Sequence, residues 1–248
     1  MFEGMLPKRN SKPKIGPGRR VYAIGDIHGR YDLFRQLISA IDADLAAKPI
    51  ETPEIVILGD FIDRGPASQE VVDYILHLKS QRDVIVLKGN HEAALLSFLE
   101  DPVAGSDWLD WGGAETLESY GVSDPMTRPA DALVQGFMNN APREHRALIN
   151  TLPLTYEAGD FFFVHAGVKP GVALEEQEER DLLWIRGSFH KAPANERPDK
   201  IIVHGHHPTK RPVDKGWRVG IDTGAVWSGR LTAVAIDDTG RRFIETGS

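Results

Sequence analysis

The first hundred residues alternate short apolar stretches with longer amphipathic ones. Segments 21–24 (VYAI), 54–58 (EIVIL) and 84–87 (VIVL) are rich in branched side chains and end at polar, glycine-containing loops, which predicts buried strands. Between them, apolar side chains recur at helical spacing in 31–47 and 67–79, which predicts helices with one face in the core. The alternation predicts βαβ units. The loops at the carboxyl ends of their strands should then meet at one edge of a sheet.

The rest of the chain predicts a helical insertion followed by a second β-rich part. Residues 100–150 contain turn signals and irregular apolar spacing. We expect Trp108 and Trp111 to pack this insertion on the sheet; the alternative is that they stack on a nucleobase. Further strands are predicted at 161–164 (FFFV), 182–185 (LLWI), 201–203 (IIV), 217–221 (WRVGI) and 231–236 (LTAVAI), with a hairpin turn at 237–240. No linker interrupts the pattern, so we expect a flexible basic leader over 1–20 and a single domain over 21–248.

Composition excludes several classes of function. The 248 residues are 41% hydrophobic and 26% charged with a net charge of −7, which suits a soluble globular protein and disfavours a nucleic-acid or membrane partner. The chain has no cysteine, which rules out disulfides, thiolate metal sites and a phosphocysteine intermediate. No segment has the apolar centre of a secretion signal or the length of a membrane span, so we expect a cytoplasmic protein.

Polar motifs follow five of the predicted strands. They are GDIHG (25–29), GDFIDRG (59–65), KGNHE (88–92), HAG (165–167) and HGHHP (204–208). Each motif alone has an ordinary structural explanation, as a helix cap, an ion pair or a histidine in a turn. Asn90, for example, would serve as the N-cap of a helix that reaches Leu99. Five such motifs at strand ends, each with a neighbouring glycine, instead predict one shared site.

The motifs together supply a set of metal ligands. The candidates are Asp26, His28, Asp60, Asn90, His165 and His206. Oxygen and imidazole donors without sulfur suit manganese, iron or zinc. The set is larger than one tetrahedral ion needs, whereas two ions sharing a bridging carboxylate would use all of it.

In this order the motifs resemble those of the calcineurin-like metallophosphoesterase superfamily. The Asp-Arg-Gly that ends the second motif and the His-Glu after Asn90 are similar to its phosphoprotein phosphatase branch, and HAG at 165–167 favours a bacterial-type serine/threonine protein phosphatase. The resemblance extends through 221–236 and so covers nearly the whole chain after the leader. It implies an α/β fold, namely a four-layer α/β/β/α sandwich with a mostly helical insertion and with metals at the edge of the two central sheets.

The resemblance also implies a role for each matching residue. Asp26, His28 and Asp60 would hold the first ion, and Asp60 would bridge to a second ion held by Asn90, His165 and His206. His91 would protonate the leaving oxygen, Asp63 would orient His91, and Arg64 and Arg186 would bind phosphate. Two divalent ions are expected, manganese first with iron or zinc as alternatives, and hydroxide held by them would attack phosphorus directly.

The resemblance favours a serine/threonine protein phosphatase acting on phosphoproteins. The alternative is a nucleoside polyphosphate hydrolase of the diadenosine tetraphosphatase type, which shares the motifs and would differ in the insertion and in 186–217. A pseudophosphatase that only binds partners is disfavoured, because every expected catalytic residue is present. We expect a monomer.

Histidines outside the ligand set are expected to have structural roles. His77, His145 and His190 are predicted at the surface. His204 and His207 flank the candidate ligand His206, and we expect His204 to be structural and His207 to be a polar turn residue or a substrate contact.

Overall fold

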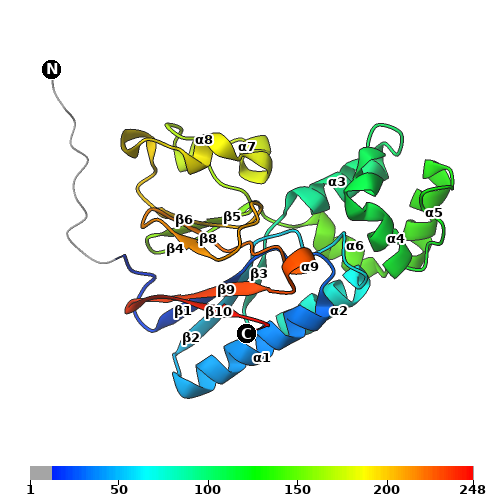
Figure 1. Ribbon diagram of the computed structural model, residues 1–248. Coiled ribbons are helices and arrows are strands. Elements are labelled where there is room, and N and C mark those ends of the chain that lie inside the picture. The colour runs from blue at the N-terminus through cyan, green and yellow to red at the C-terminus, as the bar shows by residue number, and fades with distance from the viewer. Residues whose placement is uncertain (1–12, 248) are drawn as a thin grey trace.

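The computed structural model describes residues 13–247 and contains two five-stranded sheets that lie between helices (Figure 1). The first sheet has the order β10-β9-β1-β2-β3 and the second has the order β4-β5-β6-β8-β7. The strands of the first sheet are β1 (Arg19–Ile24), β2 (Thr52–Ile57), β3 (Val84–Val86), β9 (Thr232–Asp237) and β10 (Gly240–Glu245). Those of the second are β4 (Thr155–Ala158), β5 (Phe161–Val164), β6 (Ile201–His204), β7 (Val213–Asp214) and β8 (Arg218–Gly220).

Parallel pairing places the carboxyl ends of neighbouring strands at the same edge of each sheet. In the first sheet β1 is parallel to β2 and β2 is parallel to β3, whereas β9 is antiparallel to β1. In the second sheet β5, β6 and β8 are parallel, and β4 and β7 are antiparallel edge strands. The loops that leave β1, β2 and β3 therefore emerge on one side of the first sheet, and those that leave β5, β6 and β8 on one side of the second.

Helices cover the outer faces of both sheets (Figure 1). They are α1 (Tyr31–Ala47), α2 (Ser68–Lys79), α3 (Asn90–Glu100), α4 (Ala114–Ser119), α5 (Ala130–Asn140), α6 (Arg143–Asn150), α7 (Glu179–Trp184), α8 (Gly187–His190) and α9 (Ala225–Ser228). A turn of π-helix, η1 (Leu109–Gly113), and two 3₁₀ turns, η2 (Leu174–Glu176) and η3 (Ala194–Glu196), complete the set. None of the helices in the described part of the chain has the length and apolarity to cross a bilayer.

Alternation along the strands creates three apolar layers. Tyr22 and Ile24 of β1 pack in the cluster with α1 and α2, while Val21 and Ala23 pack in a second cluster with side chains of β5 and β6. A third cluster joins the outer face of the second sheet to α7 and α8. These layers confirm the predicted α/β/β/α sandwich, because each sheet buries one face against the other sheet and one against helices.

Two local predictions are wrong. Segment 182–185, expected as a strand, belongs mostly to α7, which buries Leu182 and Leu183 and leaves Trp184 exposed. A short apolar run does not distinguish a strand from a buried helical turn, and the preceding acidic residues extend it into a helix. Asn90 is the first residue of α3, and Gly89 occupies the cap position.

Residues 100–150 are mostly helical, as predicted, and pack on the first sheet's helical side through the buried Trp108. The expected packing of Trp111 is wrong, because its side chain is exposed. His145 is not at the surface as expected, because it is buried with Nδ1 2.9 Å from the Tyr120 hydroxyl and Nε2 3.0 Å from the Asp73 carboxylate. Those contacts connect α6 to α4 and α2.

The expected leader lies partly outside the described residues, which begin at position 13. Its described part packs on the domain: Ile15 is buried, and its amide donates to the Asp238 carboxylate at 3.0 Å. Arg19 and Arg20 already belong to β1, and Arg20 pairs with Asp237 at 2.9 Å. Packed structure therefore starts before Val21.

Candidate metal centre

The predicted loops meet in one place. The amides of His28 and Gly29 donate to the carbonyls of Asp60 and Phe61 at 2.9 and 3.0 Å, which joins the loops after β1 and β2. Across the second sheet, the Gly205 amide donates to the His165 carbonyl at 2.8 Å. The convergence expected from the strand order is confirmed.

His165 lies where several acceptor atoms converge. Its Nδ1 is 2.9 Å from the Leu58 carbonyl and must donate to it, so Nε2 carries the lone pair. That Nε2 faces Asn90 Oδ1 at 2.9 Å, His206 Nδ1 at 3.2 Å and Asp60 Oδ2 at 3.4 Å. Lone pairs that face one another at these distances repel unless a cation lies between them, which is how metal ligands are arranged.

A second group of donors also lies close to the Asp60 carboxylate. His28 Nε2 is 3.7 Å and His91 Nε2 is 3.9 Å from Asp60 Oδ2, and the Nδ1 of His28 is held by the Ile62 carbonyl at 2.9 Å. The carboxylate of Asp60 thus belongs to both donor groups, one with His28 and His91 and one with His165 and His206. This is the position that a bridging ligand requires.

The protonation states fit cation binding. Burial lowers the pKa of His28 to about 3 and, with the nearby His165, that of His206 to about 2, so both imidazoles are neutral at neutral pH. Nε2 of His206 is buried and has no hydrogen-bond partner among the described residues. Burial and the carboxylates of Asp222 and Asp60 raise the pKa of Asp26 well above its usual range. Divalent ions would relieve this clustering of buried carboxylates and satisfy the open imidazole nitrogen.

Asp26 is held beside His206 by a backbone contact. The His206 amide lies 3.1 Å from both carboxylate oxygens of Asp26. A Cβ at Gly205 would lie 2.1 Å from Asp26 Oδ1, so only glycine permits this approach. A Cβ at Gly89 would similarly lie 2.2 Å from Asp60 Oδ1.

His91 and Asp63 form a buried pair beside the donor groups. His91 Nδ1 is 2.7 Å from Asp63 Oδ2, so the ring's Nε2 points toward Asp60. Burial acts to lower the pKa of His91, but Asp60 and Asp63 outweigh burial and raise it above its usual value. Asp63 is itself fixed by Trp108 Nε1 at 2.7 Å and by the Thr116 hydroxyl at 2.6 Å.

The two predicted arginines lie at different depths. Nη1 of Arg64 is 2.6 Å from Nε2 of His28, and its amide donates to the Gly112 carbonyl at 3.0 Å. Arg186 is exposed, and no salt bridge within residues 13–247 holds its guanidinium. Burial is the largest cause of the lowered pKa of His165 and of His206, and the charge of Arg186 contributes in the same direction.

The backbone is strained where the site is built. Positive φ angles of 47 to 71° occur at His28, Asp60, Asp63, Arg64 and His206. Such angles cost non-glycine residues free energy and persist at functional positions where the surroundings enforce them.

Two carboxylates are part of the site although they were absent from the predicted set. Glu92 accepts backbone N–H bonds from Gly89, Asp60, Phe61 and Ile62 at 2.8 to 3.3 Å. Burial and the Asp60 charge raise the pKa of Glu92 to about 8, and the backbone donors act in the opposite direction.

Asp222 follows β8 and accepts from the Gly224 amide at 2.8 Å, and burial raises its pKa to about 6. The signals for both were in the sequence: Glu92 at the third position of a helix, and Asp222 beside a glycine after a strand.

The remaining histidines lie outside the ligand groups. His77 is exposed as predicted, whereas His190 is half-buried, and its ring centroid lies 4.4 Å from that of the exposed His207 with the two rings tilted. His204 is buried with Nδ1 3.0 Å from the Gly205 carbonyl, as expected of a structural residue.

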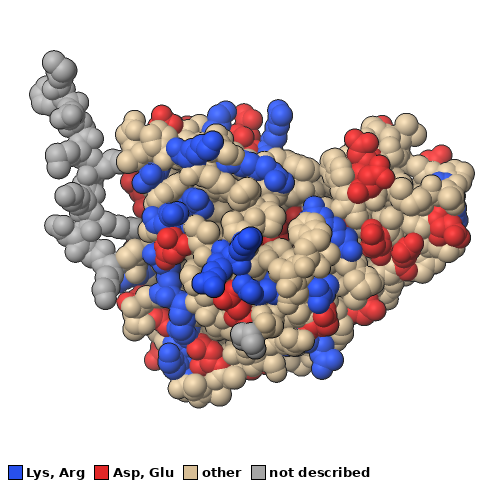
Figure 2. Space-filling view, in the orientation of Figure 1, with Lys and Arg blue, Asp and Glu red and all other residues tan. Residues whose placement is uncertain are grey.

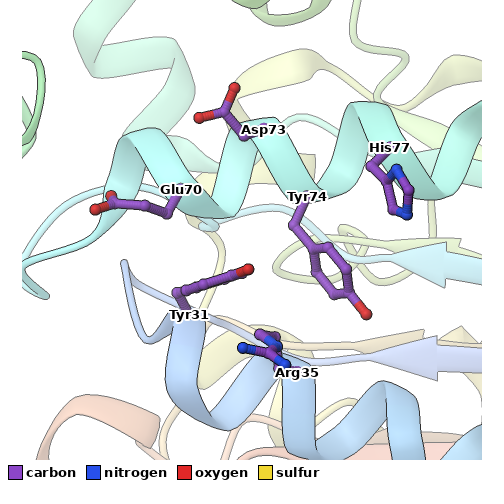
Figure 3. Close-up of a pocket in the computed structure, with 6 residues that line it drawn as sticks. All are labelled: Tyr31, Arg35, Glu70, Asp73, Tyr74 and His77. Atoms are coloured by element: carbon purple, nitrogen blue, oxygen red, sulfur yellow. The ribbon is translucent and has the colours of Figure 1, made fainter.

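A separate hollow of about 600 Å³ lies between α1 and α2 (Figure 3). It is lined by Tyr31, Arg35, Glu70, Asp73, Tyr74 and His77. None of the predicted site residues lines it.

A model of one known protein family matches most of the chain. A family model described as calcineurin-like phosphoesterase matches residues 19–229. The chain is 28% identical over 230 residues to bis(5'-nucleosyl)-tetraphosphatase PrpE [asymmetrical] of Anoxybacillus flavithermus. The aligned region covers 85% of this chain and 88% of the relative. The protein of the same name from Bacillus subtilis is 26% identical over 84% of this chain and 87% of its own length.

Solved structures share the fold. A crystal structure provisionally identified as a diadenosine tetraphosphatase superposes with a TM-score of 0.62 at 19% identity, over 96% of this chain and 97% of the other. A Saccharomyces cerevisiae serine/threonine phosphatase superposes with a TM-score of 0.58 at 15% identity, over 94% and 81% of the two chains. At these identities the likeness concerns the fold alone.

Proposed function

The chain belongs to the calcineurin-like phosphoesterase family, and within it we propose a metal-dependent hydrolase of dinucleoside polyphosphates, with diadenosine tetraphosphate as the type substrate. The convergence of buried acceptor atoms around Asp60 supports the metal-dependent hydrolase. The substrate class rests on relatives named as tetraphosphatases that match most of this chain. Sequence analysis favoured a serine/threonine protein phosphatase, but these relatives favour its alternative.

In this proposal the two donor groups hold two divalent ions, for which manganese is the first metal to test. His28 and Asp60 of the first group would bind one ion together with Asp26, while His91 would remain free to act as the acid. Asn90, His165 and His206 would bind the other ion, with Asp60 shared. When bound, such ions supply an acidified water as nucleophile and neutralise charge on the phosphoryl oxygens.

The remaining residues would act on the substrate directly. Arg64 would leave His28 and, with Arg186, bind phosphoryl oxygens through the planar fork of the guanidinium. His91 would present the Nε2 proton to the leaving oxygen, because its Nδ1 is engaged by Asp63. Trp108 and Thr116 would keep that carboxylate, and so the imidazole, in place.

The test is a direct comparison of substrates. Protein stripped of metal and reconstituted with manganese is assayed for kcat/KM on diadenosine tetraphosphate and on a phosphothreonine peptide. We expect the dinucleotide to be preferred. A preference for the peptide would reject the proposal in favour of a protein phosphatase, and absence of metal-dependent turnover on either substrate would reject the hydrolase itself.

A further inference from the structure

Three large aromatic side chains remain exposed next to the candidate metal centre. Trp111, Trp184 and Trp227 are 42, 39 and 66% exposed, whereas most large apolar side chains of the described residues are buried. Single exposed apolar residues are common, but tryptophans that gather at the rim of a site call for a ligand.

Trp227 belongs to the single turn of α9, which is fixed at both ends. Gly224 before it and Gly229 after it have φ angles of 69 and 68°, and the Arg30 guanidinium donates to the Ala225 carbonyl at 2.9 Å. The Cζ atom of Arg64 lies 5.2 Å from the centroid of the Trp227 ring, within the range of a cation–π contact. Since the same guanidinium contacts His28, the ring lies one side chain away from the donor group of His28 and Asp60.

Trp184 and Trp111 form a second aromatic surface. Their ring centroids are 5.6 Å apart in an edge arrangement, and the Trp184 ring lies 6.3 Å from the ring of His206. This pair adjoins the donor group of Asp60, His165 and His206. Each half of the metal centre therefore has its own exposed aromatic neighbour.

Positive charge accompanies the aromatic surfaces. Arg64 lies against Trp227 and Arg186 lies two residues after Trp184. Arg230, which follows α9 in the sequence, donates to the Lys210 carbonyl at 3.0 Å and lies 3.9 Å from the Glu245 carboxylate. Figure 2 shows blue side chains gathered on the face that carries α9 in Figure 1, although the chain has a net charge of −7. A polyphosphate is negatively charged and would be attracted to such a positively charged surface.

We propose that Trp227 and the Trp111–Trp184 pair are stacking sites for the two nucleobases of a dinucleoside polyphosphate, whose phosphates lie across the metal centre between them. The proposal rests on the proposed function and names how that substrate is recognised. Stacking on tryptophan tolerates any base, because every base has a π-face. It would also favour substrates with two bases over those with one.

The test uses the full chain with manganese and two substrates, diadenosine tetraphosphate and p-nitrophenyl phosphate. Trp227→Leu and Trp184→Leu should each lower kcat/KM on the dinucleotide by roughly 5- to 150-fold, the factor that corresponds to about 1–3 kcal/mol of stacking per base. Turnover of p-nitrophenyl phosphate should change little. Trp227→Phe should retain most of the dinucleotide activity, because it keeps an aromatic face.

Phe243→Leu is the matched control, since Phe243 is an exposed aromatic residue on the outer strand β10. It should leave both activities unchanged. If the Leu variants keep full dinucleotide activity, or lose both activities equally, the stacking proposal is wrong while the proposed function stands. If the unmodified protein prefers a phosphothreonine peptide to the dinucleotide, the proposed function is wrong and the base sites with it.

Discussion

Replacing His91 with asparagine separates acid catalysis from metal binding and distinguishes the two candidate substrates. His91 Nδ1 is held 2.7 Å from Asp63, and Nε2 lies 3.9 Å from Asp60. Asparagine removes the group that can donate a proton to a leaving oxygen. It keeps a polar side chain at this position and leaves the backbone contact from residue 91 to Asp60 Oδ1, at 3.0 Å, in place.

The size of the loss should depend on the leaving group. General acid catalysis contributes roughly 10²–10⁴-fold when the leaving oxygen needs a proton. The alkoxide that leaves a phosphothreonine peptide needs such a proton. The phosphate that leaves a dinucleoside polyphosphate has a last pKa of about 6 and hardly needs one. We therefore expect a loss of roughly 10²–10⁴-fold on the peptide, and of roughly tenfold or less on diadenosine tetraphosphate and p-nitrophenyl phosphate.

The assay measures kcat/KM of the variant on these three substrates together with its metal content by mass spectrometry. His145→Asn is the matched control, because His145 is a buried histidine with a carboxylate partner away from the metal centre. It should lower stability and leave turnover unchanged. Equal losses on all three substrates would refute the acid role of His91, and loss of bound metal would make it a ligand, as its place in the donor group with His28 and Asp60 permits.

Two further changes test the site and its support. Asp60→Asn should lower the content of both metals and abolish nearly all turnover, and retention of two ions per chain would contradict the bridging role. Glu92→Gln replaces an acceptor of backbone N–H groups with a donor, so urea denaturation should show a loss of about 2–6 kcal/mol, from roughly 1–3 kcal/mol for each of two unsatisfied amides. A loss below about 1 kcal/mol would refute that account.

In Asp237, burial acts to raise the pKa, but the Thr239 hydroxyl and Arg20 lower it from 3.8 to about 2. Its stabilising effect is thus complete above pH 3.8 and is lost as the pH falls through about 2, so Asp237→Asn should cost about 2–3 kcal/mol near neutrality and progressively less in acid. A cost that does not depend on pH would contradict the ion pair.

The sequence predicted the strand ends well because their physical signal is local. Branched apolar runs followed by Gly-Asp or Gly-Asn identify a buried strand and a close backbone approach, and Gly89 indeed lies where a Cβ would meet Asp60. The grouping of ligands followed from the parallel order of strands, which the alternation of strands and helices implies.

What the sequence did not predict depends on contacts between distant segments. The burial of His145 comes from Tyr120 and Asp73, which belong to other helices. The exposure of Trp227 depends on α9 lying at the rim of the site, and the helical state of 182–185 depends on packing against the second sheet. Neither composition nor periodicity contains these relations.

The hydrogen bonds around the site explain how it tolerates a strained backbone and buried carboxylates. Positive φ angles at ligand positions cost roughly 1–3 kcal/mol each, and buried carboxylates repel one another. Glu92 opposes the first of these effects, because its side-chain oxygens accept hydrogen bonds from the amides of the second and third loops, even though burial and the Asp60 charge disfavour its own ionisation. The loops are thus fixed by protein groups rather than by the ions themselves. We therefore expect metal to bind to ligands that are already in position, and this is the reason that a Glu92 variant should lose stability even when no metal is present.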